Sequence, residues 1–479
     1  MTNGNFLNNK FCEQTNWQSI YGAGLLSLIV NAQYTIYFSS VWPYLQVLVP
    51  DIKEEFYGLL FASYSLGTIL FSPIFGWWSN KLKGIKIPLY VGVLCQLIGN
   101  IIYLSLGELK GNQKEFILLA RLINGVGAAN VSLLRSYAAT SSLPKDRTSA
   151  ISVINCGLAI GIALGPFFNI IFAAIGFPEY RILNLFTLNI YTLSAFISTI
   201  LNILSLGCIK LLFVERYAGI SENFVKTKKN LGNGKSIQSI PKYDKCAVSI
   251  IFLIRFTMMF IKNTCNILNP FLSMMMFNFT KKESIKVMSI TEGFVGSTAV
   301  FVHALYVFFN LGQYGKFRRN LIIGLSFLPL FHVIIYPYPF LYGGKETVSI
   351  LNIQNSTITS STEQIGCNIN KFDWCYDLPK ISPYLYFICY AILIGLSLPV
   401  INANMNTIFS RILGPRFQGT MHGFNHMYGS IAQAIAPIIT STVYKNYGPT
   451  KVWWYQIILS LFTTIICTIF HNRLVPMLN

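Results

Sequence analysis

The sequence has 479 residues, of which 53% are hydrophobic and 11% are charged. Soluble domains carry about 25% charged residues, so this chain has too little charge to cover a water-exposed surface. The composition excludes a soluble enzyme, a disordered protein and a secreted disulfide scaffold, and it indicates a helical protein that crosses a membrane many times. A net charge of +19 would suggest nucleic-acid binding in a soluble domain. Here the Lys and Arg residues lie in short segments between apolar runs, which indicates membrane orientation and no nucleic-acid partner.

Twelve apolar runs follow one another along the chain, and each is long enough to cross about 30 Å of hydrocarbon. Such crossings must be helical because lipid offers the backbone no hydrogen bonds. We predict an all-α membrane protein with twelve transmembrane helices in two pseudo-symmetric six-helix bundles, 17–212 and 246–470. A polar linker at 213–245 joins the bundles, and polar tails occupy 1–16 and 471–479. The runs lie at about 17–42, 57–79, 87–107, 116–138, 150–175, 186–212, 246–277, 284–310, 321–342, 383–410, 421–443 and 452–470.

The distribution of basic residues predicts which ends of the helices face the cytosol. Segments on the N-terminal side of the membrane, including 135–149 and 213–245, hold 20 Lys and Arg residues, against 12 on the opposite side. By the positive-inside rule, both termini and the linker are therefore cytosolic.

The opposite side carries one long loop, at about 343–382, that we expect to face a lumen. Glycosylation sequons begin at Asn355 inside this loop and at Asn278 closer to the membrane, and both are predicted glycosylation sites. Cys367 and Cys375 lie in the same loop and face an oxidising compartment during synthesis. We expect either a disulfide between them or two unrelated loop thiols.

The two halves of the chain repeat the same short signals. Basic loops follow the second and eighth runs, basic turns follow the fourth and tenth, and the fifth and eleventh runs each contain a proline preceded by small residues. Parallel six-helix halves imply a pseudo-two-fold axis along the membrane normal and a central cavity between them. The residues that carry these signals include Gly76, Asn80, Lys81, Arg147, Arg416 and, in the fifth run, Gly157, Gly161, Gly165 and Pro166.

These residues resemble motifs of the major facilitator superfamily. Gly76-x3-Asn80-Lys81 is similar to the family's loop between helices two and three, which braces the cytosolic gate. Arg121-x3-Gly125-x-Gly127 is similar to its fourth-helix motif, and Gly161-x3-Gly165-Pro166 to its fifth-helix motif. The resemblance implies a transporter that works by alternating access, with a cytosolic gate at Gly76, Asn80, Lys81, Arg147 and Arg416. Asn80 stands where the family usually has Asp, so this position of the cytosolic gate carries no charge.

A narrower resemblance covers most of the chain and concerns the lysosomal facilitators whose loss causes a neuronal ceroid lipofuscinosis. It implies a glycosylated protein of the lysosomal or late endosomal membrane that moves chloride or another small anion. The order and spacing of short motifs carry it: Ala62-Ser63-Tyr64-Ser65-Leu66-Gly67, Ser72-Pro73-Ile74-Phe75-Gly76, Arg135-Ser136-Tyr137, Asp146-Arg147-Thr148-Ser149 and Ile412-Leu413-Gly414-Pro415.

Four ionisable side chains, Arg121, Arg255, Lys262 and Glu292, lie well inside apolar runs, where charge is costly and usually marks function. Arg255 and Lys262 are seven residues apart, so they project from one helix face, which must meet a cavity or a partner. Two interpretations stay open. Either these cations attract an anion, with Arg121 across the cavity, or Glu292 neutralises one of them and fixes helix packing. Glu292 is itself either a structural counter-ion or a proton carrier.

Asn402 and Asn406 lie four residues apart on one face of the tenth run, and they hydrogen-bond either solute or another helix. His303 and His332 are expected to pack or to form hydrogen bonds rather than to relay protons. His422-x3-His426 has the spacing of metal ligands, but five His are too few for a membrane di-iron enzyme, so we expect no metal or cofactor.

We therefore predict a transporter of a small anion, with proton coupling as an option, and not an enzyme, since no nucleophile–base pair or ATP-binding motif is present. The alternatives are a channel-like anion pore and a non-transporting membrane scaffold or receptor. Tyr217-Ala218-Gly219-Ile220 in the linker has the form of a sorting signal that adaptor proteins bind.

Overall fold

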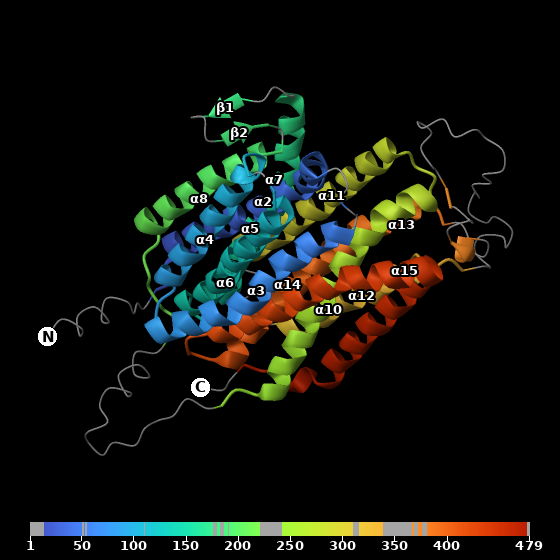
Figure 1. Ribbon diagram of the computed structural model, residues 1–479. Helices are drawn as coiled ribbons and strands as arrows, with labels where there is room; N and C mark the ends of the chain where they lie inside the picture. Colours follow the sequence, from blue (N-terminus) through green and yellow to red (C-terminus); the bar gives the residue numbers. More distant parts are fainter. Residues whose placement is uncertain are drawn as a thin grey trace, which may run out of the picture.

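The computed structural model describes residues 14–49, 52, 55–109, 111–175, 180–182, 186–189, 191–220, 242–309, 316–338, 366–367, 372–375 and 381–476. Ten helices in this part of the chain are long and apolar enough to cross a membrane. They run side by side as one bundle (Figure 1). The predicted helical membrane fold is confirmed.

Two features relate these ten helices to the twelve predicted crossings. Helix α2 (Trp17–Leu48) is a further helix of 32 residues. Helix α15 (Gly419–Ile469) is two helices joined at a break, where Gly448 has a φ of 76° that residues with a Cβ rarely adopt. The count of twelve membrane crossings stays a prediction.

The N-terminal half contains seven described helices. The fourth predicted crossing is divided into two helices that meet at Ala129, and the sixth begins later than predicted, because residues 186–188 form a strand. That strand pairs antiparallel with another, so that Tyr180 lies opposite Leu188. The elements are α2, α3 (Glu55–Leu82), α4 (Lys86–Leu104), α5 (Gln113–Ala128), α6 (Asn130–Ser141), α7 (Arg147–Ile175), β1 (Tyr180–Ile182), β2 (Phe186–Leu188) and α8 (Leu193–Leu211).

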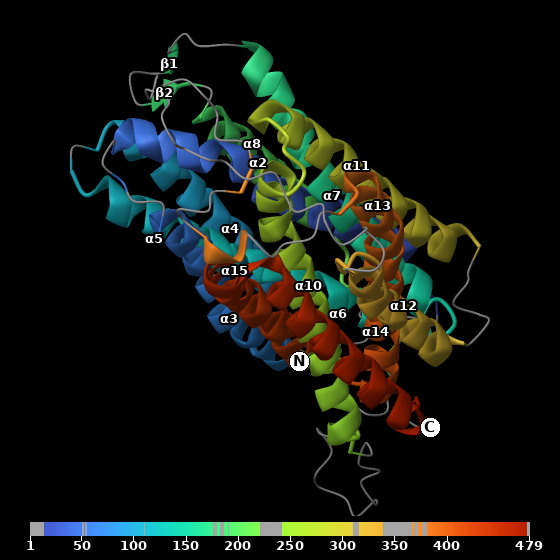
Figure 2. The same cartoon turned by 90° about the vertical axis from the view of Figure 1, so that its right-hand side faces the viewer.

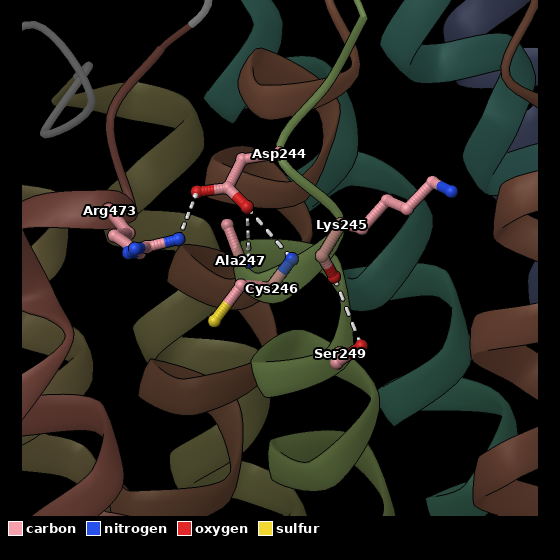
Figure 3. A network of polar contacts seen from close by, with 6 residues as sticks. All are labelled: Asp244, Lys245, Cys246, Ala247, Ser249 and Arg473. Atoms are coloured by element: carbon pink, nitrogen blue, oxygen red, sulfur yellow. Dashed lines mark hydrogen bonds and ion pairs between the residues drawn. The ribbon is translucent and has the colours of Figure 1, made fainter.

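The C-terminal half begins with α10 (Lys245–Met275), whose start is capped and anchored. The Asp244 carboxylate accepts hydrogen bonds from the backbone N–H groups of Cys246 and Ala247, and it pairs with Arg473 at 3.6 Å (Figure 3). The end of α15 is therefore attached to the start of α10. The other elements are α11 (Lys281–Phe308), α12 (Phe317–Ile334), α13 (Pro383–Cys389), a π-helical turn (Tyr390–Ile394), α14 (Gly395–Leu413) and α15.

Helix packing follows the same pattern in the two halves. Helix α2 packs along α7 in the first half, and α10 packs along α15 in the second. The halves meet where α3 lies against α15 and α7 against α11 (Figures 1 and 2). The starts of α2 and α10 and the ends of α3, α6, α8 and α14 lie at one end of the bundle, which we call the predicted cytosolic end.

Small residues allow these close helix contacts. A Cβ atom on Gly157 would lie 2.2 Å from the carbonyl oxygen of Gly24, and one on Gly161 would lie 2.4 Å from that of Leu28. At Gly165 the added atom would meet the Thr35 hydroxyl at 2.1 Å. Helix α7 therefore contacts the backbone of α2 directly, as small-xxx-small stripes do in membranes. Pro166 follows Gly165 within α7.

Each half has its own apolar core. One cluster joins α10, α12, α13 and α14, and two others lie within the N-terminal half. Large apolar side chains such as Leu211, Phe308 and Ile438 are 63–82% exposed on the outside of the bundle. Such exposure is expected of a surface that meets lipid.

Candidate solute pathway

Arg121 lies in a small polar cavity within the N-terminal half. Helix α5 carries Arg121, whose side chain is 4% exposed and whose guanidinium carbon lies 4.5 Å from the centre of the Tyr37 ring. The cavity has room for about one water molecule. No acidic residue is among its lining residues, which are Val30, Gln33, Tyr34, Tyr37, Tyr64, Gln96, Asn100, Arg121 and Asn124.

Hydrogen bonds hold the polar walls of this cavity in place. The Tyr37 hydroxyl donates to Asn100 Oδ1 at 2.8 Å, and Asn124 Nδ2 donates to the same oxygen at 3.2 Å. Asn100 Nδ2 is buried without a partner. Across the described residues, Arg121 itself forms no hydrogen bond or ion pair with a protein group. Its guanidinium lies over the Tyr37 ring, in the geometry of a cation–π contact.

The C-terminal half closes against this cavity through Gln433 of α15. The Gln433 side-chain amide donates a hydrogen bond to the hydroxyl of Tyr34. The ring of Tyr34 lies 5.0 Å from that of Tyr64, centre to centre, on α3. Movement of α15 relative to α2 would therefore change the wall beside Arg121.

The C-terminal half brings Lys262 and Glu292 near each other. They come from α10 and α11, both are half-buried, and they interact electrostatically. No ion pair within 4.0 Å joins them among the described residues. Glu292 Oε1 instead accepts a hydrogen bond of 2.8 Å from the Tyr390 hydroxyl in the π-helical turn. Charge is thus balanced here without direct contact between the two groups.

Arg255 faces two asparagines of α14. Its NH1 group donates a long hydrogen bond of 3.5 Å to Asn402 Oδ1, while its Nε is buried without a partner. Asn406 Nδ2 donates to both the carbonyl oxygen and Oδ1 of Asn402, each at 2.8 Å. Neither Arg255 nor Lys262 lines the Arg121 cavity. The structure therefore does not bring the three predicted cations into one cavity.

At the predicted cytosolic end, neutral hydrogen bonds join the two halves. Asn80 Oδ1 accepts from the backbone N–H of Gly419 at 2.9 Å, and Asn80 Nδ2 donates to Thr420 Oγ1 at 2.8 Å. A Cβ atom on Gly76 would lie 2.3 Å from the Gly419 carbonyl oxygen. Arg411 also donates to the Pro144 carbonyl oxygen at 3.3 Å, so several contacts join the two halves at this end.

The other expected gate residues make different contacts. Lys81 lies over the ring of Trp77 on its own helix, 5.1 Å from the ring centre. Arg147 is 5% exposed, and its Nε is buried without a partner. Arg416 lies over the Tyr243 ring at 5.3 Å, and partial burial lowers the pKa of its guanidinium.

Comparison with known proteins identifies the family. The Major Facilitator Superfamily model matches residues 25–359. The chain belongs to the major facilitator superfamily. It is 27% identical to major facilitator superfamily domain-containing protein 8 of Xenopus laevis, over 97% of this chain and 92% of that protein. The bundle described above is thus the fold of a solute transporter family.

Two solved structures share this facilitator fold. The human organic anion transporter MFSD10 (TETRAN) superimposes with a TM-score of 0.66 at 15% identity, over 94% of this chain and 99% of the other. The proton:xylose symporter XylE, bound to 6-bromo-6-deoxy-D-glucose, also gives 0.66, at 13% identity, over 94% and 95%. At these identities the likeness concerns the fold alone.

Sequence reasoning missed several residues of this facilitator's interior. Tyr34, Tyr37 and Asn100 carried no signal, because tyrosines and asparagines in apolar runs are common packing residues. Arg135, which was counted in the segment 135–149, lies inside a helix, since α6 continues to Ser141 and Arg135 is 2% exposed. The helical run of small and polar residues after Arg135 could have indicated this.

The Tyr217–Ile220 segment, predicted to be a sorting signal, is packed against the rest of the protein. Tyr217 and Ile220 are 1% and 6% exposed, and the Tyr217 ring lies 5.4 Å from that of Phe417. Burial, reinforced by the nearby Glu215 carboxylate, raises the pKa of the Tyr217 hydroxyl well above its usual value. An adaptor cannot bind both side chains while this segment stays packed. Residues 221–241 of the linker lie outside the described residues.

Around the expected lumenal loop, the described residues include Cys367 and Cys375, which form a disulfide with a Cα–Cα distance of 5.8 Å. Asn278 lies in the turn before α11 with a φ of 56°. Asn355 lies outside the described residues. Within the described chain, no group of three or more His, Cys, Asp or Glu side chains could hold a metal ion.

Proposed function

We propose that this facilitator carries a small anion by alternating access, with Arg121 as the group that binds it. The observation that carries the proposal is the guanidinium of Arg121, 4% exposed in a cavity that no acidic side chain lines. A buried cation without a carboxylate partner is costly. An anion in the cavity would remove that cost, because it supplies both charge and acceptors for the N–H groups.

The closed predicted cytosolic end supports alternating access. In this conformation the Asn80 and Arg411 contacts hold the halves together at one end, so an anion would enter the Arg121 cavity from the opposite side. Transport then requires these contacts to separate while the opposite side closes. Lys262 and Glu292, which interact electrostatically, form the second part of the proposal, in which they couple anion transport to protons.

The lysosomal or late endosomal location is proposed on the short motifs that resemble the lysosomal facilitators, with chloride or an organic anion as solute. The printed name of one fold relative, an organic anion transporter, agrees with the solute class. The location is tested by imaging the tagged chain beside lysosomal and plasma-membrane markers, where plasma-membrane signal alone would contradict it.

Flux in proteoliposomes tests the function. Arg121→Ala is compared with Lys114→Ala, which removes an exposed cation from the same helix. Loss of a charged hydrogen-bonding group costs about 1.5–3 kcal/mol, so we expect Arg121→Ala to lower anion uptake at least roughly 10-fold. Lys114→Ala should leave uptake unchanged.

Equal flux in both variants would contradict the proposal. The absence of flux of any anion in the wild type would also contradict it and would favour a scaffold or receptor. Unitary currents far above a carrier's turnover would favour a channel-like pore.

A further inference from the structure

A second group of buried cations lies outside the Arg121 cavity, between the two halves. Arg135 of α6 is 2% exposed, and Arg255 of α10 is 4% exposed. They belong to opposite halves, and α15 packs against both α6 and α10, with the Arg255 side chain beside Gly429 of α15. The two guanidinium groups also interact electrostatically. Neither Arg135 nor Arg255 lines the Arg121 cavity.

Arginine cannot relieve this repulsion by losing its proton at physiological pH. In the described part of the chain, no acceptor lies within hydrogen-bonding distance of Arg135, and no carboxylate pairs with either guanidinium. Arg255 contacts only an amide, through the 3.5 Å bond to Asn402. Glu292, the carboxylate in the interior of the described C-terminal half, contacts Tyr390 and interacts with Lys262. Two buried like charges therefore lack a protein counter-charge.

Three histidines interact electrostatically with Arg135, and two of them add unpaired polar atoms. His303 of α11 and His422 and His426 of α15 each interact electrostatically with Arg135. Both ring nitrogens of His422 and Nδ1 of His303 are buried without a partner, whereas His426 Nδ1 lies 3.1 Å from the Ser72 hydroxyl. Buried polar atoms are nearly always paired, so a cluster of unpaired ones points to a missing ligand.

We propose that a small inorganic anion of the size of chloride binds between Arg135 and Arg255 and holds the two halves together in the closed conformation. Water can satisfy the histidine nitrogens, but only an anion also supplies the missing negative charge. Each neutral imidazole offers one N–H donor, which an anion accepts. Because the two arginines belong to different halves, the anion bridges them only while the halves are together.

This site differs in role from the transport site at Arg121. Arg135 lies in α6, which packs against α15, the helix whose start carries the Asn80 contacts. We therefore assign it to the closure of the predicted cytosolic end. An anion that binds the closed conformation better shifts the equilibrium toward it by that difference in affinity. The inference shares the solute class of the proposed function, but closure can be measured without transport.

Crosslinking of the closed end tests this site. Cys is placed at Asn80 and Thr420, whose side chains contact each other, and a protease site is inserted into 221–241 so that only a crosslink keeps the halves in one band. Single-Cys variants control for the native thiols. The rate of crosslinking is measured at one pH in chloride and in gluconate, for the wild type and for Arg121→Gln, Arg135→Gln and Arg255→Gln.

We expect chloride to raise the crosslinking rate of the wild type about threefold or more, a shift in population that a modest difference in affinity provides. Arg121→Gln should keep the chloride effect even where it abolishes flux. Arg135→Gln and Arg255→Gln should lose the effect, and Arg135→Lys should keep part of it.

An equal chloride effect in Arg135→Gln and the wild type would overturn the site, as would crosslinking of the wild type that does not depend on the anion. Loss of the effect in Arg121→Gln alone would also overturn it and assign closure to the transport site. If neither Gln variant folds, the crosslinking rate of the wild type is measured in chloride, bromide and nitrate against gluconate. A rate that responds to none of these anions would overturn the site. Loss of flux in the wild type with chloride-dependent closure intact would reject only the transport proposal.

Discussion

The two halves of this facilitator place a cation in their interiors in different ways. In the N-terminal half, Arg121 lies against Tyr37 with no carboxylate in its cavity. In the C-terminal half, Lys262 interacts with Glu292, which a tyrosine hydroxyl also binds. The first arrangement leaves a buried cation without a carboxylate beside it, while the second places a carboxylate near the cation. Similar helix packing therefore supports two electrostatic roles.

Removing each of the two cations in turn tests this difference most strongly. Arg121→Gln removes the charge from the N-terminal cavity, so we expect the half-saturating anion concentration to rise roughly 10-fold or more. Lys262→Gln leaves that cavity intact and should change it less than about threefold. Anion-dependent uptake in proteoliposomes measures both. A larger effect of Lys262→Gln would place anion binding in the C-terminal half.

Glu292→Gln tests whether the balanced pair couples transport to protons. The variant keeps an acceptor for Tyr390 but cannot ionise, so we expect anion uptake to lose its response to a pH gradient while exchange without a gradient continues. Uptake with and without an inward proton gradient is the measurement, and Glu283→Gln, at the exposed start of the same helix, is the control. An unchanged response to the gradient would leave Glu292 with a structural role.

Tyr37→Phe separates the ring of Tyr37 from its hydroxyl. The ring stays over Arg121, whereas the 2.8 Å hydrogen bond to Asn100 is lost. A neutral hydrogen bond contributes about 0.5–1.5 kcal/mol, so the half-saturating anion concentration should rise about two- to tenfold, less than for Arg121→Gln. Tyr37→Leu, which also removes the ring, should have the larger effect. Equal effects of the two variants would show that the ring contributes nothing to the site.

Asn80→Asp should have the smallest effect of these variants, and it concerns the gate alone. The carboxylate keeps the hydrogen bond from the Gly419 N–H and lies at the N-terminus of α15, where a negative charge is stabilised by about 0.3–1 kcal/mol. We expect crosslinking at the predicted cytosolic end to be faster and turnover to fall about two- to fivefold. Asn80→Ala should do the opposite. For crosslinking, the Cys pair is placed at Ser72 and His426, whose side chains lie 3.1 Å apart between the same two helices, since position 80 is occupied by the test. Faster turnover in Asn80→Asp would contradict the closed-state stabilisation.

Much of the fold was predictable because each signal is local. Apolar runs, the basic segments between them, and the glycines at 157, 161 and 165 depend only on neighbouring residues or on one helix face. The pairing of charges was not predictable in this way. Glu292 and Lys262 are thirty residues apart in the sequence, and whether they touch depends on the rotation of two helices. The hydrogen bond between Tyr390 and Glu292 depends on a π-helical turn that no periodicity indicated.

The amino-acid sequence alone determined that this chain crosses a membrane as helices, that it repeats in two halves, and that Arg121 is a candidate for solute binding. These properties follow from the cost of exposing charge and backbone to lipid, which any segment carries wherever it packs. Only the tertiary structure decided which cations lack a carboxylate partner, that Arg255 lies outside the Arg121 cavity, and that α6, which carries Arg135, packs against α15 of the other half. Those relations depend on which helix faces contact each other, and these contacts are determined only when the whole bundle packs together.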